Sequence, residues 1–402
     1  MKRLMGFLLI IALFLAGCGG PEPLAPASSG NPAGKPADEA FIESQTHLAI
    51  ALLQQAVKAD AGKNLLISPL SVAAALSMTA NGAAGAAREE MLELLGGHAA
   101  EDLNNYYYSY LQGLGKELSL ANSVWIRDAE RLTVEEAFLQ IVTDYYGAEI
   151  YREPFDHSTV EAINGWVDRN TDGMIQKMVE EISEDTVLYL INALAFDGEW
   201  ENTYERSDVV TGLFANADGV TRQAEMLNSE EHCYLETELF TGFLKDYKGG
   251  NFRFGALLPK EDGAEALIQK LTAEALLEAV ENAENTSVGV RMPKFSYEYE
   301  ISLNEPLQAL GMKTAFDSAL ADLSPMATSR AGNLYVSKVL HKTFIEVSEK
   351  GTRAGAATSV EVNEESAEVF MKEVILDRPF VYFILDAETN LPVFLGILAE
   401  LS

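Results

Sequence analysis

The stretch of residues 343–362, TFIEVSEKGTRAGAATSVEV, limits the possible folds of this chain more than any other feature. It begins as a strand and is interrupted at residues 348–351. Counting by twos from Thr352 to Val362 then gives only small or apolar side chains, which is the period of a half-buried strand. The first of these side chains are too small to hold the segment in a core, so the pattern predicts two available states, loop and strand. An ordinary surface loop is the alternative interpretation.

The N-terminus predicts export from a cell. Lys2 and Arg3 precede an apolar run that is too short to cross a bilayer, which indicates a signal peptide rather than a transmembrane helix. The tetrapeptide LAGC, which ends at Cys18, resembles the lipobox of bacterial lipoproteins and implies cleavage before Cys18 and lipidation of its thiol. We therefore expect residues 1–17 to be a lipoprotein signal peptide, and the globular part to be anchored to the bacterial cell envelope outside the cytoplasm. A plain signal peptide cut near the same place is the alternative.

The rest of the chain is expected to form one domain behind a tether. Residues 18–40 are rich in Pro, Gly, Ser and Ala, cannot bury a core, and are typical of a flexible tether. No similar linker follows, so residues 41–402 are expected to be a single domain despite their length. The hydrophobic content of 48% is sufficient for a sizeable core. We expect a monomer.

The charge and the cysteine content argue against nucleic-acid binding, an intramolecular disulfide and a catalytic thiol. The net charge of −32 argues against nucleic acid as a partner. If Cys18 carries lipid, Cys233 is the one remaining cysteine and no intramolecular disulfide is available. Its neighbour His232 would lie on the opposite side of any strand, so an inert thiol is favoured over a catalytic one.

Local patterns predict several elements. Helical spacing predicts helices over residues 40–57 and 133–146, and the second begins with a capping-box signature, Thr133-x-x-Glu136. Residues 187–200, VLYLINALAFDGEW, are typical of a buried central strand, and residues 243–258 of a hairpin.

Two segments near the C-terminus carry a family resemblance. Residues 335–358, YVSKVLHKTFIEVSEKGTRAGAAT, resemble the hinge of the serpins, and residues 378–396, RPFVYFILDAETNLPVFLG, resemble their C-terminal strand pair. Further segments that look like serpin motifs follow the family's order, at residues 64–83, 164–175, 288–299 and 304–317. The chain is thus similar to the serpins from about residue 41 to 400. This resemblance implies an α+β serpin fold with three β-sheets, about eight or nine helices and an exposed reactive loop.

The resemblance also implies a function. Serpins are suicide-type inhibitors of serine endopeptidases, with cysteine endopeptidases as a second target class. The target attacks the loop and forms a covalent acyl-enzyme, and the cut loop then inserts into the main sheet as a new strand. No cofactor, no metal and no enzymatic activity are implied. The hinge residues would be Glu349, Gly351, Thr352, Arg353, Ala354, Gly355, Ala356, Ala357 and Thr358.

The same resemblance places the reactive bond. The usual interval from the hinge puts it at Glu365-Ser366. The alternation agrees, because its apolar set ends at Val362 and meets a carboxylate at Glu364, where insertion should end. Glu364-Glu365 and Val362-Asn363 remain alternative bonds. Glutamate before the bond would suit a glutamate-preferring protease. Arg353 stands where the family usually has glutamate, on the outward-facing set, where it should be tolerated.

Four positions are expected where the sheet must part to admit the loop. Ser68 and Ser71 begin a segment that, in the family, turns from a short strand into a helix beneath the main sheet; simple capping of that helix is the alternative. Asn192 is a polar residue in an apolar strand and needs hydrogen-bond partners. His341 is interpreted as a structural histidine, with a protonation switch for sheet opening as the alternative.

The sequence bears on two rival functions. A surface hydrolase is the first, but the sequence has no Gly-x-Ser-x-Gly, Ser-x-x-Lys or His-Glu-x-x-His motif and no EF-hand loop. A non-inhibitory surface binding protein with the serpin fold is the second. Such a protein would not need an alternating hinge of small residues.

Overall fold

The computed structural model describes residues 21, 23–24, 32–184, 186–352 and 372–401. These residues form nine α-helices: α1 (Glu39–Ala59), α2 (Pro69–Asn81), α3 (Gly85–Leu94), α4 (Ala100–Gly113), α5 (Glu136–Tyr146), α6 (His157–Asn170), α7 (Gly263–Lys270), α8 (Ala273–Glu281) and α9 (Asn304–Ala309). Two short 3-10 helices are η1 (Arg206–Asp208) and η2 (Thr314–Phe316). None of the helices in these ranges has the length and apolar character needed to span a membrane.

The largest sheet has nine strands. In spatial order they are β1 (Leu65–Ile67), β18 (Pro392–Leu398), β17 (Phe380–Asp386), β10 (Phe252–Pro259), β9 (Phe240–Asp246), β8 (Thr221–Glu236), β11 (Glu284–Pro293) and β16 (Lys372–Ile375), and β7 (Val209–Ala215) pairs with β8. The pair β11–β16 is parallel. β17 and β18 are nearly continuous apolar runs and are buried along almost their whole length, as expected for strands covered on both faces.

Two smaller sheets form one layer, which we call the split sheet. One half contains β12 (Phe295–Ser302), β14 (Leu340–Val347), β15 (Gly351–Thr352) and β6 (Gly198–Glu199), and the other contains β4 (Glu149–Glu153), β2 (Leu118–Arg127) and β5 (Leu188–Phe196). β5 leads into β6 after a single residue, so the halves are connected at that end. A separate short pair joins β3 (Leu132–Val134) to β13 (Ala327–Ser329).

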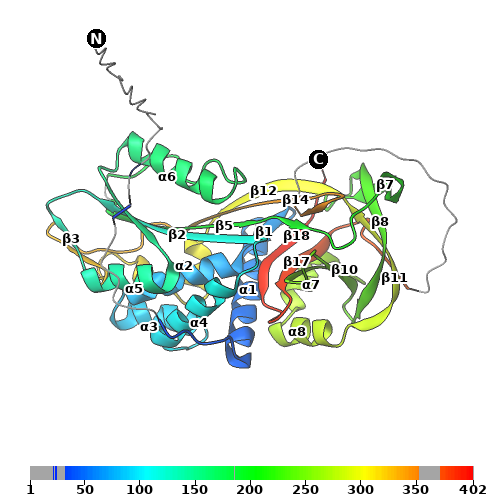
Figure 1. Ribbon diagram of the computed structural model, residues 1–402, viewed down its shortest axis with the longest axis horizontal. Coiled ribbons are helices and arrows are strands. Elements are labelled where there is room, and N and C mark those ends of the chain that lie inside the picture. The colour runs from blue at the N-terminus through cyan, green and yellow to red at the C-terminus, as the bar shows by residue number, and fades with distance from the viewer. Residues whose placement is uncertain (1–20, 22, 25–31, 185, 353–371, 402) are drawn as a thin grey trace, which may run out of the picture.

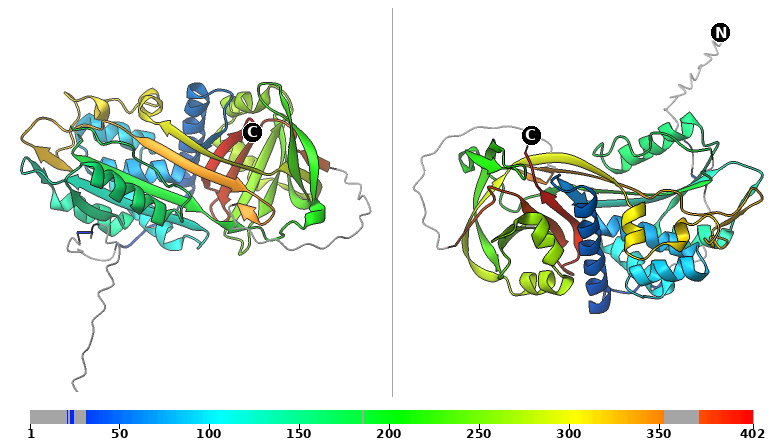
Figure 2. Two further views of the ribbon diagram at one scale, coloured as in Figure 1. Left: turned by 90° about the horizontal axis from the view of Figure 1, so that it is seen from above. Right: turned by 180° about the vertical axis from the view of Figure 1, so that it is seen from behind.

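Helices cover the split sheet on both faces. Figure 1 shows α6 on one side of it and α2, α3, α4 and α5 on the other, and the view from behind in Figure 2 agrees. Trp125 of β2 packs with Ile163 and Trp166 of α6 in a core cluster of its own. The predicted α+β fold, with eight or nine helices and several sheets, is confirmed. The predicted limits of the domain, tether and signal peptide stay predictions.

One predicted helix starts later than its sequence signature indicates. α5 begins at Glu136, with no side-chain cap, and Thr133 lies in β3 opposite Thr328. Thr133 is thus part of a ladder with a strand far along the chain instead of capping a helix. Pairing in the tertiary structure therefore overrides the local capping preference here.

Candidate functional site

The described residues of the predicted hinge, up to Thr352, lie where the two halves of the split sheet meet. After β14 the chain turns, with the amide of Ser348 donating to the carbonyl of Gly351 at 2.9 Å. In β15, Gly351 lies opposite Glu199, and Thr352 lies opposite Gly198. β15 also pairs with β14 on its other side. The first two residues of the hinge strand are therefore already inserted between two strands.

Gly351 is required here because its backbone comes very close to the next strand. A Cβ atom at this position would lie 2.0 Å from the carbonyl oxygen of Gly198. Gly351 is not one of the glycines with a positive φ. A close backbone approach, rather than a turn that needs a positive φ, is therefore the physical reason for glycine at this position.

Replacing Gly351 with alanine should displace β15 from β6. We expect a loss of about 1–3 kcal/mol in unfolding free energy, as for other overpacked sites, measured by urea denaturation. Gly113→Ala is the matched control, because an added Cβ there meets no atom within 4 Å and φ is not positive. It should leave the free energy of unfolding unchanged or raise it by up to about 1 kcal/mol, because alanine favours the helix and restricts the unfolded chain. Equal urea midpoints for the two variants would contradict the close-approach argument.

Three buried aromatic residues lie against the hinge and hold its backbone; we call Trp200, Tyr204 and Tyr247 the aromatic floor. The amide of Trp200 donates to the carbonyl of Lys350 at 2.8 Å, and its Nε1 donates to the carbonyl of Ser348 at 2.9 Å. The amide of Tyr204 donates to the carbonyl of Glu349 at 2.9 Å. Three hydrogen bonds to main-chain carbonyls therefore hold the turn before β15 in place.

The aromatic floor also contacts Thr352, the last described residue of the predicted hinge. Thr352 is 2% exposed, and its hydroxyl shares a hydrogen bond with the hydroxyl of Tyr247. The Tyr247 ring stacks on Trp200 with a centroid distance of 4.5 Å. Thr352 is thus held by its ladder on both sides and by a buried side-chain hydrogen bond.

A buried ion pair supports the aromatic floor. Nζ of Lys245 lies 2.7 Å from Oε1 of Glu231, and their side chains are only 3% and 10% exposed. The same ammonium lies 4.7 Å from the ring centroid of Tyr204 and 5.5 Å from that of Trp200. The ammonium of Lys245 therefore lies next to one carboxylate and two aromatic rings.

Lys294 binds the same turn through the side chain of Glu349. Lys294, between β11 and β12, places its Nζ 2.7 Å from Glu349 and 3.0 Å from Glu225. Burial would raise the pKa of Glu349, but the hydrogen bond from Lys294, a backbone hydrogen bond and the charges of the nearby lysines together outweigh it, and the pKa lies below its usual value. Burial likewise opposes the charge on Lys294, yet its two carboxylate partners raise its pKa. Both groups are charged at neutral pH, so the hinge turn is tied to β12.

Beyond β15, along β14 and β5, the two halves of the split sheet are not paired with each other in the described chain. Within the residues that the structure describes, no backbone ladder joins β14 to β5. Side chains are in contact instead: Leu340 and Phe344 of β14 and Tyr189 of β5 pack against the core cluster that α6 covers. The sheet therefore offers two strand edges with the backbone groups that a further strand would need.

The structure brings three of the four predicted sheet-opening residues together. The amide of Ser68 donates to Nε2 of His341 at 3.0 Å, and the amide of Ser71 donates to Oγ of Ser68 at 3.3 Å, which caps α2. Asn192 instead donates to Oδ1 of Asn122 on the neighbouring strand at 2.7 Å. Its own Oδ1 is buried and has no hydrogen-bond partner in the described part of the chain. Their predicted role in sheet opening stays a prediction.

His341 is buried and neutral. Because Ser68 donates to Nε2, that nitrogen carries no proton, and burial lowers the pKa of the ring to about 4. The unfolded chain would bind a proton near pH 6.5 while the folded chain would not, so stability is complete above that pH and falls as the pH drops toward 4. We expect a loss of about 2 kcal/mol from this group between pH 7.5 and 5.

Urea denaturation of the wild type and of His341→Gln at both pH values measures this loss. Glutamine keeps an acceptor for Ser68 but does not titrate, so subtracting the two curves removes the contribution of the carboxylates. The wild type should lose more stability than the variant as the pH falls. Parallel losses would contradict the assignment of a depressed pKa to His341.

The remaining predicted site residues lie outside the described residues. They are Cys18, Arg353, Ala354, Gly355, Ala356, Ala357, Thr358, Val362, Asn363, Glu364, Glu365 and Ser366.

Sequence reasoning missed the groups that hold the hinge in place. Lys294 lies inside a segment that resembles a family motif, but its partner Glu349 lies 55 residues further along the chain. Trp200 ends the strand that the sequence predicted, and this position carried no sign of a hinge contact. Lys245 reads as an exposed residue on a hairpin strand, and no pattern in the sequence indicates its burial.

Comparison with known proteins gives a consistent result. A family model described as "Serpin (serine protease inhibitor)" matches residues 43–401. The chain is 33% identical over 373 residues to Serpin-ZXA of Oryza sativa subsp. japonica, covering 87% of this chain and 93% of that protein. It is 30% identical over 384 residues to leukocyte elastase inhibitor A of Mus musculus, covering 89% and 98%.

Solved structures agree, and they distinguish between conformations. The thermophilic serpin tengpin in its native state matches with a TM-score of 0.88 at 42% identity, covering 93% of this chain and 98% of that one. The latent state of the same protein matches with a TM-score of 0.83, covering 92% and 100%. The arrangement described above is therefore more similar to the native than to the latent state of that protein.

Proposed function

The chain belongs to the serpin family, and on that premise we propose that it is a suicide-type inhibitor of serine endopeptidases. Cysteine endopeptidases are the second target class. The loop that follows β15 is offered as a substrate, and its insertion into the split sheet after cleavage traps the protease as a covalent complex. The partner is thus the target endopeptidase itself.

One observation carries this proposal. Gly351 and Thr352 are already paired between β14 and β6, while β14 and β5 share no ladder below them in the described chain. In the proposed mechanism these two residues begin the inserted strand, and a longer inserted segment would occupy the strand edges beyond them. A fully paired sheet would have no place for another strand.

The covalent step follows ordinary serine protease chemistry. The protease's serine oxygen attacks the carbonyl carbon of the residue before the reactive bond, an ester forms, and the peptide bond breaks. The new amine leaves with a proton from the protease's histidine. The released N-terminal part of the loop, still esterified to the protease, is then free to enter the sheet.

Insertion supplies the energy that stops the reaction. Fourteen residues at about 3.3 Å each span about 46 Å, so the attached protease is carried across the molecule. On the order of 14–20 new backbone hydrogen bonds at about 0.5–1.5 kcal/mol each release roughly 10–30 kcal/mol. Loss of one oxyanion-hole donor raises the activation free energy of a protease by about 2.7–4 kcal/mol. The free energy released by insertion exceeds this amount, so it is sufficient to distort the protease's active site and to stop hydrolysis of the ester.

We place the reactive bond at Glu365-Ser366, with Glu364-Glu365 and Val362-Asn363 as alternatives. Support comes from the family's usual interval after the hinge and from the end of the apolar alternation at Val362. Glutamate before the bond favours a glutamate-preferring serine protease as the target.

The experiment mixes the protein with such a protease and follows the products on a denaturing gel and by mass spectrometry. The expected result is a gel-stable complex and a released C-terminal peptide that begins at Ser366. Cleavage with full turnover and no stable complex would instead identify a substrate or a non-inhibitory binding protein with the serpin fold. A peptide starting elsewhere would move the reactive bond.

We further propose that the protein is exported and anchored by lipid on Cys18, with its domain outside the cytoplasm. The lipobox-like LAGC sequence and the short apolar run before it support this. Radioactive palmitate supplied to a bacterial host expressing the full chain should label the protein, and Cys18→Ala should abolish the label. Equal labelling of the variant would overturn the anchor.

A further inference from the structure

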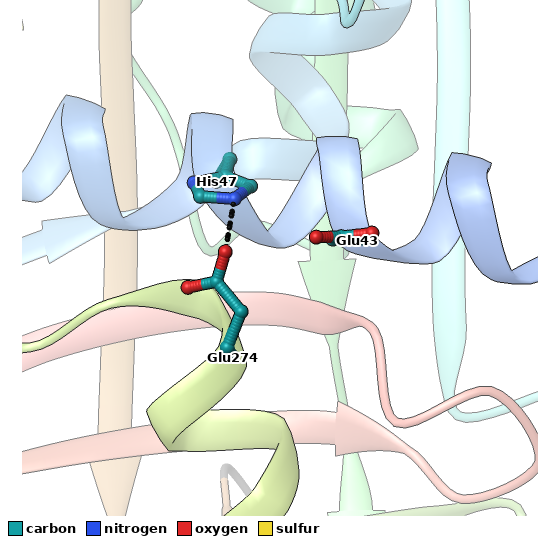
Figure 3. A group of neighbouring side chains, drawn as sticks. All are labelled: Glu43, His47 and Glu274. Atoms are coloured by element: carbon teal, nitrogen blue, oxygen red, sulfur yellow. Dashed lines mark hydrogen bonds and ion pairs between the residues drawn. The ribbon is translucent and has the colours of Figure 1, made fainter.

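Three side chains that commonly bind metal ions meet on the outer surface where α1 passes α8. Glu43 and His47 are four residues apart on α1, and Glu274 lies in the first turn of α8. One ligand atom from each residue lies within 4.8 Å of the others. Figure 3 shows Glu43 and His47 on the same helix, with Glu274 reaching toward His47 from the neighbouring one.

The three side chains are carried by a rigid support. α1 is a helix of 21 residues whose opposite face is buried in the core, including Leu48 and Leu52. At the start of α8, the hydroxyl of Thr272 accepts a hydrogen bond from the amide of Ala275 at 3.2 Å and caps the helix. The ligand positions are therefore set by two packed helices rather than by loops.

The site is open to solvent, on a protein whose charge favours cations. The side chains of His47 and Glu274 are 53% and 58% exposed, so an ion has access from solvent. The net charge of −32 attracts cations to the surface as a whole.

The distance between the first two ligands fits a transition metal. Nε2 of His47 lies 2.9 Å from Oε1 of Glu274. Nitrogen and oxygen ligands at about 2.0–2.2 Å from a tetrahedral zinc ion are about 3.4 Å apart, so a movement of about 0.5 Å between these two exposed side chains would admit the ion. Glu43 is a flexible, exposed side chain on the next turn of α1 and can complete the set by a change of rotamer.

We propose that Glu43, His47 and Glu274 form a zinc site that joins α1 to α8. An imidazole nitrogen with two carboxylates suits Zn²⁺, whereas Ca²⁺ and Mg²⁺ favour all-oxygen sites. In the hydrogen bond to Glu274, Nε2 of His47 carries the proton, because a carboxylate only accepts. On binding, this proton is released to water, Nε2 gives its lone pair to the ion, and the neutral ring takes a proton from water on Nδ1. The ion takes the place of the His47–Glu274 hydrogen bond and holds the two helices together, independently of protease inhibition.

The test is a zinc chloride titration of the full chain, purified in detergent without a histidine tag and dialysed against EDTA. Calorimetry should give one zinc per chain, and zinc at about 100 times its dissociation constant should raise the folding equilibrium constant about 100-fold, seen as a higher melting temperature. Calcium chloride and magnesium chloride should produce neither effect. Absence of zinc binding, or equal responses to all three salts, would overturn the site.

Variants identify the ligands. His47→Ala and Glu274→Gln should each abolish the zinc-dependent rise in melting temperature, and Glu43→Gln should weaken zinc binding at least about tenfold. His157→Ala is the matched control, since His157 and Glu161 form an exposed pair four residues apart on α6 with Nε2 and Oε1 3.6 Å apart. The control should respond to zinc like the wild type. A zinc response that survives His47→Ala and is lost in His157→Ala would overturn the assignment.

Discussion

Replacing Thr352 with arginine should leave the reactive loop cleavable but abolish the covalent complex with the protease. Thr352 is 2% exposed and is paired with Val347 on one side and Gly198 on the other. A guanidinium cannot be accommodated there without leaving a buried charge unpaired, which costs several kcal/mol. Insertion of the following residues must extend the strand from this position, so displacing it slows insertion, and the protease has time to hydrolyse the ester and escape. A denaturing gel after mixing with the target protease measures the outcome.

Thr352→Val is the control for this prediction. Valine has nearly the same shape and loses only the hydrogen bond to Tyr247, so it should still form the complex. Wild type and Thr352→Val should show a gel-stable band, while Thr352→Arg should show only the cleaved chain. A stable band of normal intensity from Thr352→Arg would exclude Thr352 from the inserting strand.

Replacing Lys245 with methionine should destabilise the fold by about 3–5 kcal/mol, the usual cost of breaking a buried ion pair on one side. The variant leaves Glu231 without the ammonium 2.7 Å away, in a place where water has little access. It also removes the cation from the rings of Trp200 and Tyr204, which hold the hinge turn. Urea denaturation should therefore show a lower midpoint.

Two further variants separate the possible causes. Lys245→Met combined with Glu231→Met removes both charges and should recover most of the stability, since an apolar pair of similar volume often replaces a buried ion pair without loss. Lys63→Met removes the partner of Asp60 at a site where the lysine is 64% exposed, and should change the free energy by less than about 1 kcal/mol. A double variant as unstable as Lys245→Met alone would contradict the charge argument.

The sequence predicts which residues form the hinge but not the contacts that those residues make. Period-2 alternation and family resemblance place Gly351 and Thr352 at the start of an inserting strand, because side-chain size and spacing are local properties. Lys245 and Glu231 are 14 residues apart on two strands, and their burial depends on the packing of Trp200 above them. No local pattern distinguishes such a lysine from one on an exposed hairpin.

The capping residues show the same difference between local contacts, which the sequence predicts, and distant ones, which it does not. Ser68 caps α2 as its sequence context indicates, because the capping partner lies three residues away. Thr133 has an equally good local signature, yet it pairs with Thr328 in another strand. Local hydrogen bonds can be predicted from the sequence when no distant strand competes for the same backbone groups.

The melting temperature before and after cleavage of the reactive loop is the most direct test of the central claim, that the split sheet has a vacant position for one more strand. The account predicts a rise of at least about 15 °C after cleavage, because an inserted strand adds on the order of 10 kcal/mol or more to a domain of this size. A cleaved protein that melts at the same temperature as the intact one would contradict it.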